Sequence, residues 1–507
     1  MKNQQLTSPT KSEITRCGSG SPGLDDILGG GLPSGHFYLV EGEPGTGKTT
    51  LAMQFVQEGL RQGEKPLYVT LSESREELLM TAAAHRFNLD GLEILELKPS
   101  EQDLRPEGQY TVFHPAEVEL NDRVQTITTE VNRKKPRRLV IDALSEVRML
   151  AKDPLRYRRQ ILSLKEYLPD DCTVLLLDDR TSRYAELELH SIVHGVITLE
   201  RLQREYGKTR RRIEVTKLRG SAFREGFHDY VIEQGGLLVF PRLIAAEHVN
   251  DGHREAPASS GIPELDQLAG GGLDRGTSTL LIGPAGCGKT SIALRWLTTA
   301  AENGEAGAAF IFEETISTLL GRAEGLGMQL RTHVKSGRVR IDHLDPAEMS
   351  PGEFVEKVRT CVEDQQIRFV VIDSLNGFLQ AMPGEQFLAL HLHELLTYLN
   401  NRGIVTLMVL AQMGMIGAAM QTPIDVSYLA DNIVVLRYFE VRGEVRQAIS
   451  VIKKRSGAHE HTIRELRLER GHIRVGEPLH NFHGVLSGIP AMLGGDQGNG
   501  GSGNNGR

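Results

Sequence analysis

The sequence predicts an α/β protein with two tandem domains, each a mainly parallel twisted sheet flanked by helices. Apolar, strand-like runs alternate with helical stretches in both halves of the chain. The phosphate-loop motif G-x-x-x-x-G-K-T occurs twice, at 42–49 and 283–290, each time between an apolar run and a helical pattern. The spacing is constant, since 241 residues separate both Lys48 from Lys289 and Asp25 from Asp266. Two shared motifs at one spacing indicate a duplicated domain.

The length of 507 residues is too great for a single hydrophobic core, and the repeat is long enough for each copy to be a complete domain. A polar segment with a proline separates the copies, and the C-terminal tail is rich in glycine and asparagine. We therefore expect a flexible N-terminus at 1–15, a first domain at 16–248, a linker at 249–258, a second domain at 259–490 and a disordered tail at 491–507.

The composition is that of an ordinary globular protein, with 39% hydrophobic and 24% charged residues. No apolar run approaches the ~20 residues that span a membrane. The net charge of −8 gives no bulk reason to expect nucleic-acid binding. The four cysteines form no C-x-x-C pair, which argues against a zinc module and fits reduced thiols. We expect a cytoplasmic protein without nucleic-acid or membrane partners.

The elements of the first half follow in order from the apolar and helical patterns. A strand at 37–40 precedes the phosphate loop, and residues 93–118 look irregular. The expected helices are 48–61, 75–86, 119–133 and 154–167, and the further strands are 67–71, 139–142, 173–177 and 195–199, with an antiparallel pair around 210–215. The second half repeats this order, with strands at 279–282, 309–312, 369–373, 405–410 and 433–436.

Both phosphate loops are expected to bind ATP with Mg²⁺. Their glycines let backbone N–H groups surround a phosphate at a helix N-terminus. Each lysine would reach the β- and γ-phosphates, while Thr49 and Thr290 would offer a hydroxyl to the metal. The expected nucleotide-binding residues are Gly42, Gly45, Thr46, Gly47, Lys48, Thr49 and Thr50, and Gly283, Gly286, Cys287, Gly288, Lys289, Thr290 and Ser291.

Two apolar runs end in aspartate, at Asp142 and Asp373. This is the Walker B pattern, a central parallel strand whose carboxylate orders Mg²⁺ and its waters. We expect both aspartates to be catalytic.

With these motifs, the stretches 430–444, 463–466 and 482–490 resemble the KaiC circadian-clock family of tandem RecA-like P-loop ATPases. The resemblance spans roughly residues 16–490. It implies a homohexameric double ring with ATP at the subunit interfaces, slow ATP hydrolysis in the first ring and self-phosphorylation in the second. It also implies a timing or signalling switch with a KaiB-like or other signalling protein as partner.

Glu313 and Glu314 stand where the family has paired catalytic glutamates, so either could act as a base and Glu313 could help hold Mg²⁺. The alternative is a solvated helix start. The first copy reads Ser72-Glu73-Ser74 at this place. One glutamate of the pair is missing there, and Glu73 alone would have to serve.

Lys217-Leu218-Arg219 matches a family segment whose cations reach a neighbour's γ-phosphate, and Lys453-Lys454-Arg455 is its counterpart. Cations supplied in trans would stabilise charge on the transferring phosphoryl group and make activity depend on assembly. A solvated basic edge strand is the alternative.

The resemblance places adjacent serine and threonine phosphoacceptors where this chain has Ser427 and Tyr428. Ser427 could accept phosphate, with Thr422 nearby, or could be a buried structural serine. The threonine partner is replaced, so a two-site phosphorylation cycle is not expected.

Two other functions use the same core. One is a RecA- or RadA-type DNA-dependent ATPase of DNA repair, which the acidic charge, the duplication and the lack of an N-terminal C-x-x-C module disfavour. The other is a nucleotide-dependent scaffold with little turnover, which Ser72 favours. The basic run 133–138 is best read as a solvated connection, and the histidines have no metal-binding spacing.

Overall fold

The computed structural model describes residues 15–97, 115–151, 153–180, 186–203, 206–248, 255–380, 388–412, 427–480, 482–485 and 491–492. The N-terminus at 1–14, most of the expected linker and most of the expected tail lie outside these residues. The chain divides into two compact units, Met1–Arg242 and Leu243–Arg507. Residues 243–248, expected in the first domain, therefore belong to the second unit, where the backbone N–H of Ala245 donates to Glu394 Oε2 at 2.9 Å.

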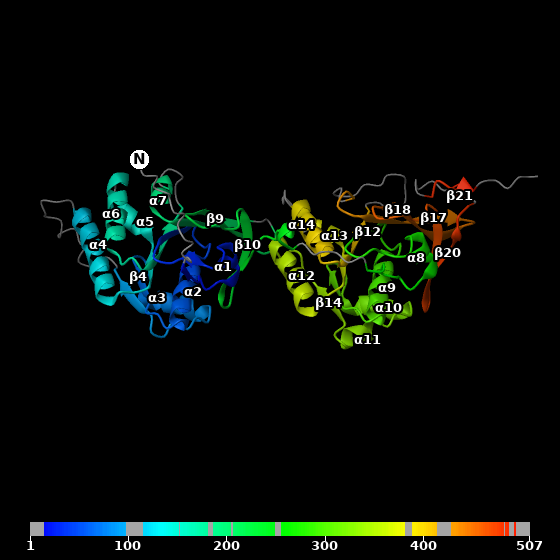
Figure 1. The fold of residues 1–507 in the computed structure, drawn as a ribbon, viewed down its shortest axis with the longest axis horizontal. Helices are drawn as coiled ribbons and strands as arrows, with labels where there is room; N and C mark the ends of the chain where they lie inside the picture. The colour runs from blue at the N-terminus through cyan, green and yellow to red at the C-terminus, as the bar shows by residue number, and fades with distance from the viewer. Residues whose placement is uncertain are drawn as a thin grey trace, which may run out of the picture. The chain divides into compact units, whose positions relative to one another are not determined.

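The first unit is built on a sheet whose described strands run in the order β11-β10-β9-β8-β3-β7-β6-β4-β5 (Figure 1). The strands from β8 to β5 are parallel, and β9 to β11 add an antiparallel extension to β8. Their bounds are β3 (Phe37–Gly42), β4 (Leu67–Thr70), β5 (Glu93–Glu96), β6 (Arg138–Asp142), β7 (Thr173–Asp179), β8 (Gly195–Leu202), β9 (Arg210–Leu218), β10 (Phe227–Glu233) and β11 (Gly236–Phe240).

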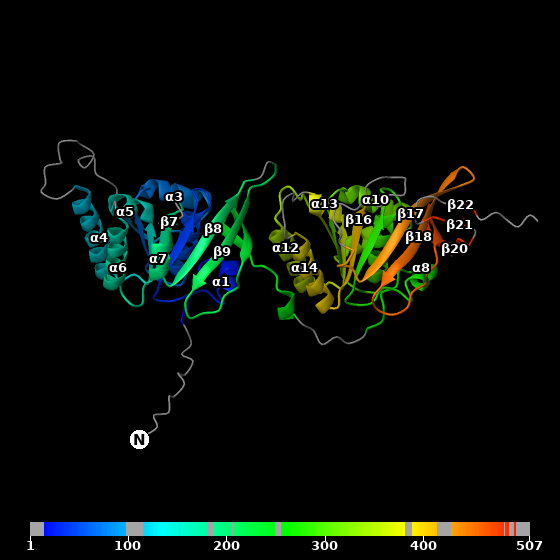
Figure 2. The same cartoon turned by 90° about the horizontal axis from the view of Figure 1, so that it is seen from above.

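Helices cover both faces of this sheet, as the two views in Figures 1 and 2 show. Apolar side chains of α2 and α3 belong to the core on one face, and those of α4, α5 and α6 to the core on the other. The short strands β1 (Arg16–Cys17) and β2 (Leu32–Pro33) form a separate antiparallel pair. The helices are α1 (Pro22–Ile27), α2 (Lys48–Arg61), α3 (Arg75–Ala84), α4 (Pro115–Lys134), α5 (Leu144–Ala151), α6 (Pro154–Tyr167) and α7 (Glu186–Ile192).

The second unit repeats this plan, with its described strands in the order β14-β13-β15-β16-β12-β17-β18-β19-β20. The strands are β12 (Ser278–Gly283), β13 (Gly307–Ile311), β14 (Val339–His343), β15 (Phe369–Asp373), β16 (Val405–Ala411), β17 (Asn432–Val441), β18 (Glu444–Lys454), β19 (Arg464–Glu469) and β20 (His472–Pro478), with a separate pair β21 (Phe482–His483) and β22 (Ala491–Met492). The helices are η2 (Ala245–His248), α8 (Pro263–Leu268), α9 (Lys289–Glu302), α10 (Ile316–Gly325), α11 (Leu330–Lys335), α12 (Pro351–Gln365), α13 (Leu375–Gln380) and α14 (Leu388–Asn401).

The predicted fold class of two tandem α/β domains is confirmed, and the phosphate-loop helix at 48–61 has the expected bounds. Some elements differ from expectation. Part of the stretch expected to be irregular forms the edge strand β5, and α4 begins four residues before the expected start at 119. Helix α5, directly after the Walker B strand, was not expected.

Arg138, at the start of β6, is fully buried. Its Nε donates to Glu64 Oε2 at 2.5 Å, and its Nη1 donates to the carbonyls of Gly18 and Phe55 at 2.6 and 2.9 Å. The guanidinium also lies 4.8 Å from the centre of the Phe55 ring. One side chain thus ties the N-terminal segment, α2 and the central strand together.

We predict that Arg138→Met destabilises the first unit by about 3–5 kcal/mol, because it leaves a partly buried carboxylate and two carbonyls without their donor. Calorimetric unfolding measures this loss. Arg133→Met is the matched control, since Arg133 pairs with Glu130 on the surface of α4 and its side chain is 64% exposed. Equal effects of both substitutions would contradict the structural role of Arg138.

Candidate functional site

The first phosphate loop joins β3 to α2, and its lysine lies inside the loop. Lys48 Nζ donates to the carbonyls of Gly42 and Glu43 at 2.8 and 3.1 Å and forms an ion pair with Asp179 Oδ1 at 2.8 Å. Gly47 takes a left-handed conformation at φ 96° as α2 begins. A side chain at Gly42 would meet the Leu199 carbonyl at 2.5 Å. The loop therefore needs glycine at these two positions.

The Walker B carboxylate of the first unit lies beside this loop. Thr49 Oγ1 donates to Asp142 Oδ2 at 3.0 Å, and the Tyr68 hydroxyl donates to the same oxygen at 2.6 Å. Burial raises the pKa of the Asp142 carboxyl, and the hydrogen bonds from Tyr68 and Thr49 oppose this rise. A hydroxyl and a carboxylate in contact are the donor set that P-loop proteins offer to Mg²⁺, so these residues fit the metal.

The second phosphate loop repeats the arrangement between β12 and α9. Lys289 Nζ donates to the carbonyls of Gly283 and Pro284 at 2.9 and 2.6 Å, and Thr290 Oγ1 donates to Asp373 Oδ2 at 2.6 Å. Burial raises the pKa of Asp373, as it does for Asp142, and the hydrogen bond from Thr290 opposes it. Cys287, a residue of this loop, is fully buried.

The two candidate glutamates of the second unit have different partners. Ser374 Oγ, directly after the Walker B strand, donates to Glu313 Oε1 at 2.7 Å. Glu314 instead pairs with Arg322 of α10. Glu313 is thus held next to the Walker B strand, whereas the charge of Glu314 is neutralised by an arginine.

The first unit differs at this point. The N–H of Leu71 donates to the Asp142 carbonyl, and the N–H of Phe312 donates to the Asp373 carbonyl, so these two residues are equivalent. The residues that follow them, Ser72 and Glu313, therefore occupy the same position. Glu73 corresponds to Glu314, and its carbonyl accepts a hydrogen bond from Thr70 Oγ1 at 2.8 Å.

The predicted trans cations bond to backbone carbonyls of their own unit. Lys217 Nζ donates to the carbonyls of His190 and Val193, and Arg219 donates to that of Ser191 at 2.6 Å. These carbonyls lie at the C-terminal end of α7, where cations are favourable. Leu218 is buried between the two cations.

The second set of cations repeats this pattern. Lys453 donates to the carbonyls of Ser427 and Ala430 at 3.1 and 2.8 Å, and Arg455 pairs with Asp431 Oδ1 at 3.0 Å. Lys454 faces elsewhere and donates to the Ala269 carbonyl at 2.7 Å. The side chain of Ser427 is half-buried, and Tyr428 is 57% exposed. Thr422 lies outside the described residues.

Four residues that contact the predicted site residues were not identified from the sequence, namely Asp179, Tyr68, Ser374 and Arg322. The first could have been found, because Asp178-Asp179-Arg180 follows an apolar strand at the sheet edge where the phosphate loop lies. The other three bond across strands or helices and leave no local signal.

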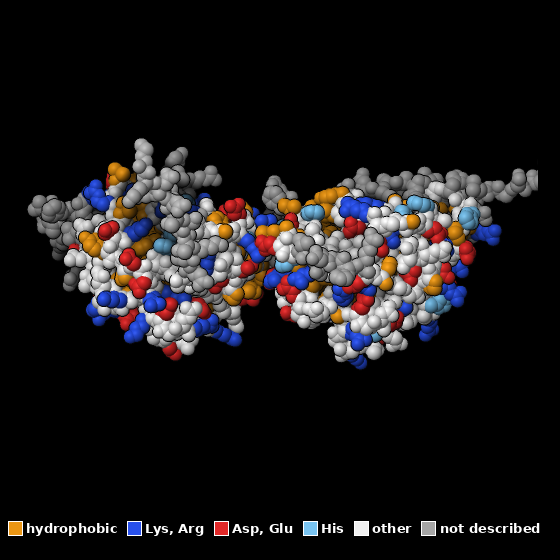
Figure 3. All heavy atoms as spheres, in the orientation of Figure 1, with side chains coloured by type: hydrophobic (Ala, Val, Ile, Leu, Met, Phe, Trp, Pro, Cys, Tyr) orange, Lys and Arg blue, Asp and Glu red, His pale blue; other side chains and the backbone are white. Residues whose placement is uncertain are grey.

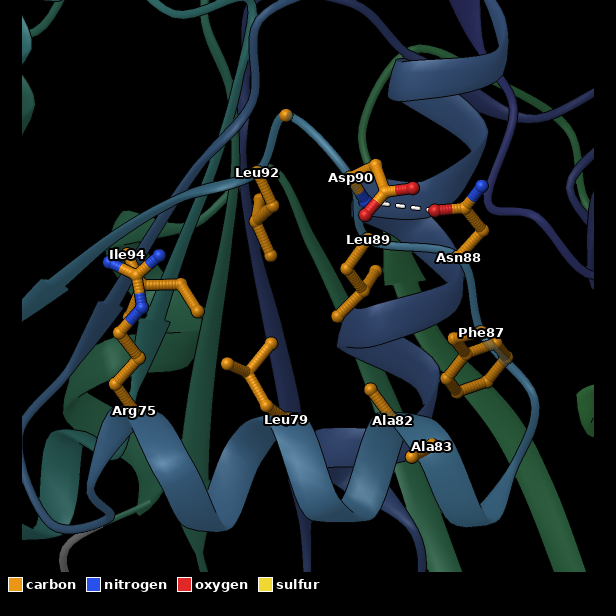
Figure 4. Close-up of a pocket in the computed structure, with 11 residues that line it drawn as sticks. Arg75, Leu79, Ala82, Ala83, Phe87, Asn88, Leu89, Asp90, Leu92 and Ile94 are labelled. Atoms are coloured by element: carbon orange, nitrogen blue, oxygen red, sulfur yellow. Dashed lines mark hydrogen bonds between the residues drawn. The ribbon is translucent and has the colours of Figure 1, made fainter.

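A separate cavity of about 350 Å³ lies in the first unit between α3 and the segment leading to β5 (Figure 4). Most of its lining residues are apolar, and Leu79 from the helix faces Leu89 and Leu92, while Arg75, Asn88 and Asp90 add polar groups. The phosphate-loop residues do not line it.

Basic and acidic side chains are interspersed on the face of each unit that Figure 3 shows. Among the described residues there is no cluster of three or more histidine, cysteine or carboxylate side chains that could hold a metal ion. None of the described helices is long and apolar enough to cross a membrane.

The fold and both sites define a tandem RecA-like P-loop protein. A model of the KaiC ATPase family matches residues 17–244 and 258–480, so the chain belongs to this family and is a KaiC-like ATP-binding protein.

The chain is similar to curated proteins over nearly its full length. It is 26% identical to the circadian clock oscillator protein KaiC of Prochlorococcus marinus (strain MIT 9313), with 98% of this chain and 100% of that protein covered. It is 26% identical to the protein of the same name from Synechococcus elongatus, covering 97% and 96%, and 26% identical to the circadian clock protein KaiC3 of Synechocystis sp., covering 94% and 95%.

We predict that Lys48→Ala and Lys289→Ala each remove one of two bound ATP molecules per chain, because each lysine serves one site. Isothermal titration measures the stoichiometry. Lys65→Ala, at an exposed lysine just beyond α2, is the control and keeps both. Unchanged stoichiometry in either phosphate-loop variant would contradict two independent sites.

Proposed function

We propose that this chain is a KaiC-like ATPase that binds and hydrolyses ATP, giving ADP and phosphate, and acts as an assembly-dependent timing or signalling switch. The observation that carries the proposal is that each phosphate-loop threonine contacts its own Walker B aspartate, Thr49 with Asp142 and Thr290 with Asp373. These pairs would hold Mg²⁺, which offsets negative charge on the phosphates when it is bound.

In the second site, Glu313 is the best-supported general base. Ser374 fixes one carboxylate oxygen at 2.7 Å, so the other can accept a proton from an attacking hydroxyl or water. Lys289, released from its two loop carbonyls, would bind the β- and γ-phosphates. Glu314 plays a supporting part, since Arg322 already neutralises it.

Assembly would supply the remaining charges. Lys217, Arg219, Lys453 and Arg455 are held near the surface by carbonyls and one carboxylate of their own unit. In a homohexameric double ring they would exchange these partners for a neighbour's γ-phosphate, which carries more negative charge. A KaiB-like or other signalling protein would then recognise the assembled state in the cytoplasm.

The second ring is also proposed to be a serine autokinase acting on Ser427. The serine Oγ would attack the γ-phosphorus of a neighbour's ATP while its proton passes to Glu313. An Oγ–P bond forms, the bond from the γ-phosphorus to the bridging oxygen breaks, and ADP leaves. The Ser427 carbonyl accepts a hydrogen bond from Lys453, one of the proposed trans cations, which supports a coupling between this serine and the subunit interface.

A nucleotide-dependent scaffold with little turnover is the second candidate. It is favoured by Ser72, which takes the position of Glu313 in the first unit. ATP-dependent partner capture without phosphate release would support it. Salt-dependent binding of single-stranded DNA would instead support a RecA- or RadA-type repair ATPase.

We predict that ATP converts protomers or dimers into a hexamer, because each site needs a neighbour's cations. Light scattering with a non-hydrolysable ATP analogue measures the mass. Arg219→Ala combined with Arg455→Ala should shift assembly to higher protein concentration. A monomer at saturating nucleotide and micromolar protein would overturn the proposal.

We predict that Glu313→Gln keeps ATP bound but lowers phosphorylation of the segment 422–428 by a factor of ~10²–10⁴, the usual loss for a positioned base. Ser427→Ala should abolish it, while Ser336→Ala, at an exposed serine outside the site, should not. Intact-mass measurement with phosphosite mapping gives the readout. Wild-type protein that carries no phosphate on this segment after incubation with Mg²⁺ and ATP would disprove the kinase activity but not the ATPase.

A further inference from the structure

The two sites differ in which strand supplies a carboxylate beside the Walker B aspartate. In the second unit the carboxylate is Glu313, after β13, and Ser374 holds it. The first unit has Ser72 and Ala143 at these two positions. Neither the glutamate nor the serine that fixes it is present there.

The first unit has a different carboxylate at the same edge of the sheet. Gly42 pairs with Asp179 in the ladder of β3 with β7, and Gly283 pairs with Ala411 in the ladder of β12 with β16. Asp179 and Ala411 therefore occupy equivalent positions. At this position the second site has the methyl group of Ala411 and the first has the carboxylate of Asp179. The reverse holds at the position of Ser72, where the second site has the carboxylate of Glu313.

The Asp179 carboxylate lies beside the lysine that is expected to bind the γ-phosphate. Its Oδ1 lies 2.8 Å from Lys48 Nζ, the atom that contacts the β- and γ-phosphates in this class of site. Its side chain is 31% exposed, so water can reach it, while the lysine is nearly buried. Ser145 Oγ of α5 lies 3.5 Å from Asp179 Oδ2.

A nearby position also differs between the two sites. Ser145 and Asn376 both stand three residues after their Walker B aspartates. Asn376 makes two hydrogen bonds to the backbone of Ala411, at 2.9 and 2.6 Å, whereas Ser145 contacts the side chain of Asp179. The residue at this position thus contacts backbone in the second site and the Asp179 carboxylate in the first.

We propose that Asp179 is the general base for ATP hydrolysis in the first site, an inference that rests on the proposed ATPase function. When Lys48 turns to the phosphates, an Asp179 oxygen accepts a proton from a water molecule. The water oxygen forms a bond to the γ-phosphorus, the bond from that phosphorus to the bridging oxygen breaks, and ADP and phosphate leave. Glu73, at the position of the arginine-paired Glu314, is not the base.

The test uses full-length protein carrying Lys289→Ala, so that only the first site turns over. Adding Asp179→Asn should lower phosphate release by ~10²–10⁴-fold, while ATP binding stays equal or becomes tighter because a negative charge beside Lys48 is removed. Asp171→Asn is the matched control, since this exposed aspartate precedes the opposite end of the same strand, and it should leave the rate unchanged.

A rescue separates catalysis from structure. Ser72→Glu with Ala143→Ser rebuilds the carboxylate and serine of the second site. Added to Asp179→Asn, this pair should raise the rate of phosphate release at least ~10-fold above that of Asp179→Asn alone. Simple loss of folding would not be rescued in this way.

Two results would overturn the inference, and they are distinct. If Asp179→Asn binds ATP more tightly at an unchanged rate, the aspartate only competes for Lys48 and the ATPase stands. If the Lys289→Ala parent binds ATP but releases no phosphate, both the role of Asp179 and the proposed ATPase activity of the first site are refuted.

Discussion

Both sites depend on one constraint, which is that parallel strands end at the same edge of a sheet. In each unit the strand before the phosphate loop is flanked by two strands, and one of these, β7 or β16, separates it from the Walker B strand. This arrangement brings the loop lysine, the threonine and the buried aspartate together without any long-range sequence signal. Burial raises the pKa of both Walker B aspartates, and the hydrogen bonds from Tyr68 and Thr49 to Asp142 and from Thr290 to Asp373 oppose this rise.

Duplication has preserved this shared core while the surrounding side chains have diverged. In both units the lysine donates to loop carbonyls and the threonine donates to the Walker B aspartate. The positions of Ser72 and Asp179, in contrast, carry glutamate and alanine in the second unit. The carboxylate beside the phosphate loop or the Walker B strand therefore comes from a different strand in each unit. This is chemically reasonable because a proton acceptor must be close to the attacking atom but need not come from a particular strand.

The sequence predicted most of the fold, because glycine-rich loops and buried parallel strands have strong local patterns. It missed β5, whose four residues are bounded by glutamates and lie at the sheet edge, where little apolar surface is buried. It identified Lys217 and Lys453 but not their acceptors, since backbone carbonyls leave no mark in the sequence. The expectation that Glu73 alone serves as the base rests on its position in the sequence, whereas the backbone pairing in the structure relates Ser72 to Glu313 and Asp179 to Ala411.

The central claim is that both sites bring a carboxylate to ATP, but from different strands. A crystal structure with Mg²⁺ and a non-hydrolysable ATP analogue tests it most directly. We predict a water within about 2.6–3.2 Å of an Asp179 oxygen and in line with the γ-phosphorus in the first site. In the second site, an oxygen of Glu313 should contact the corresponding water. The claim would be contradicted by a first site in which Asp179 turns away from the γ-phosphate and Glu73 contacts the water.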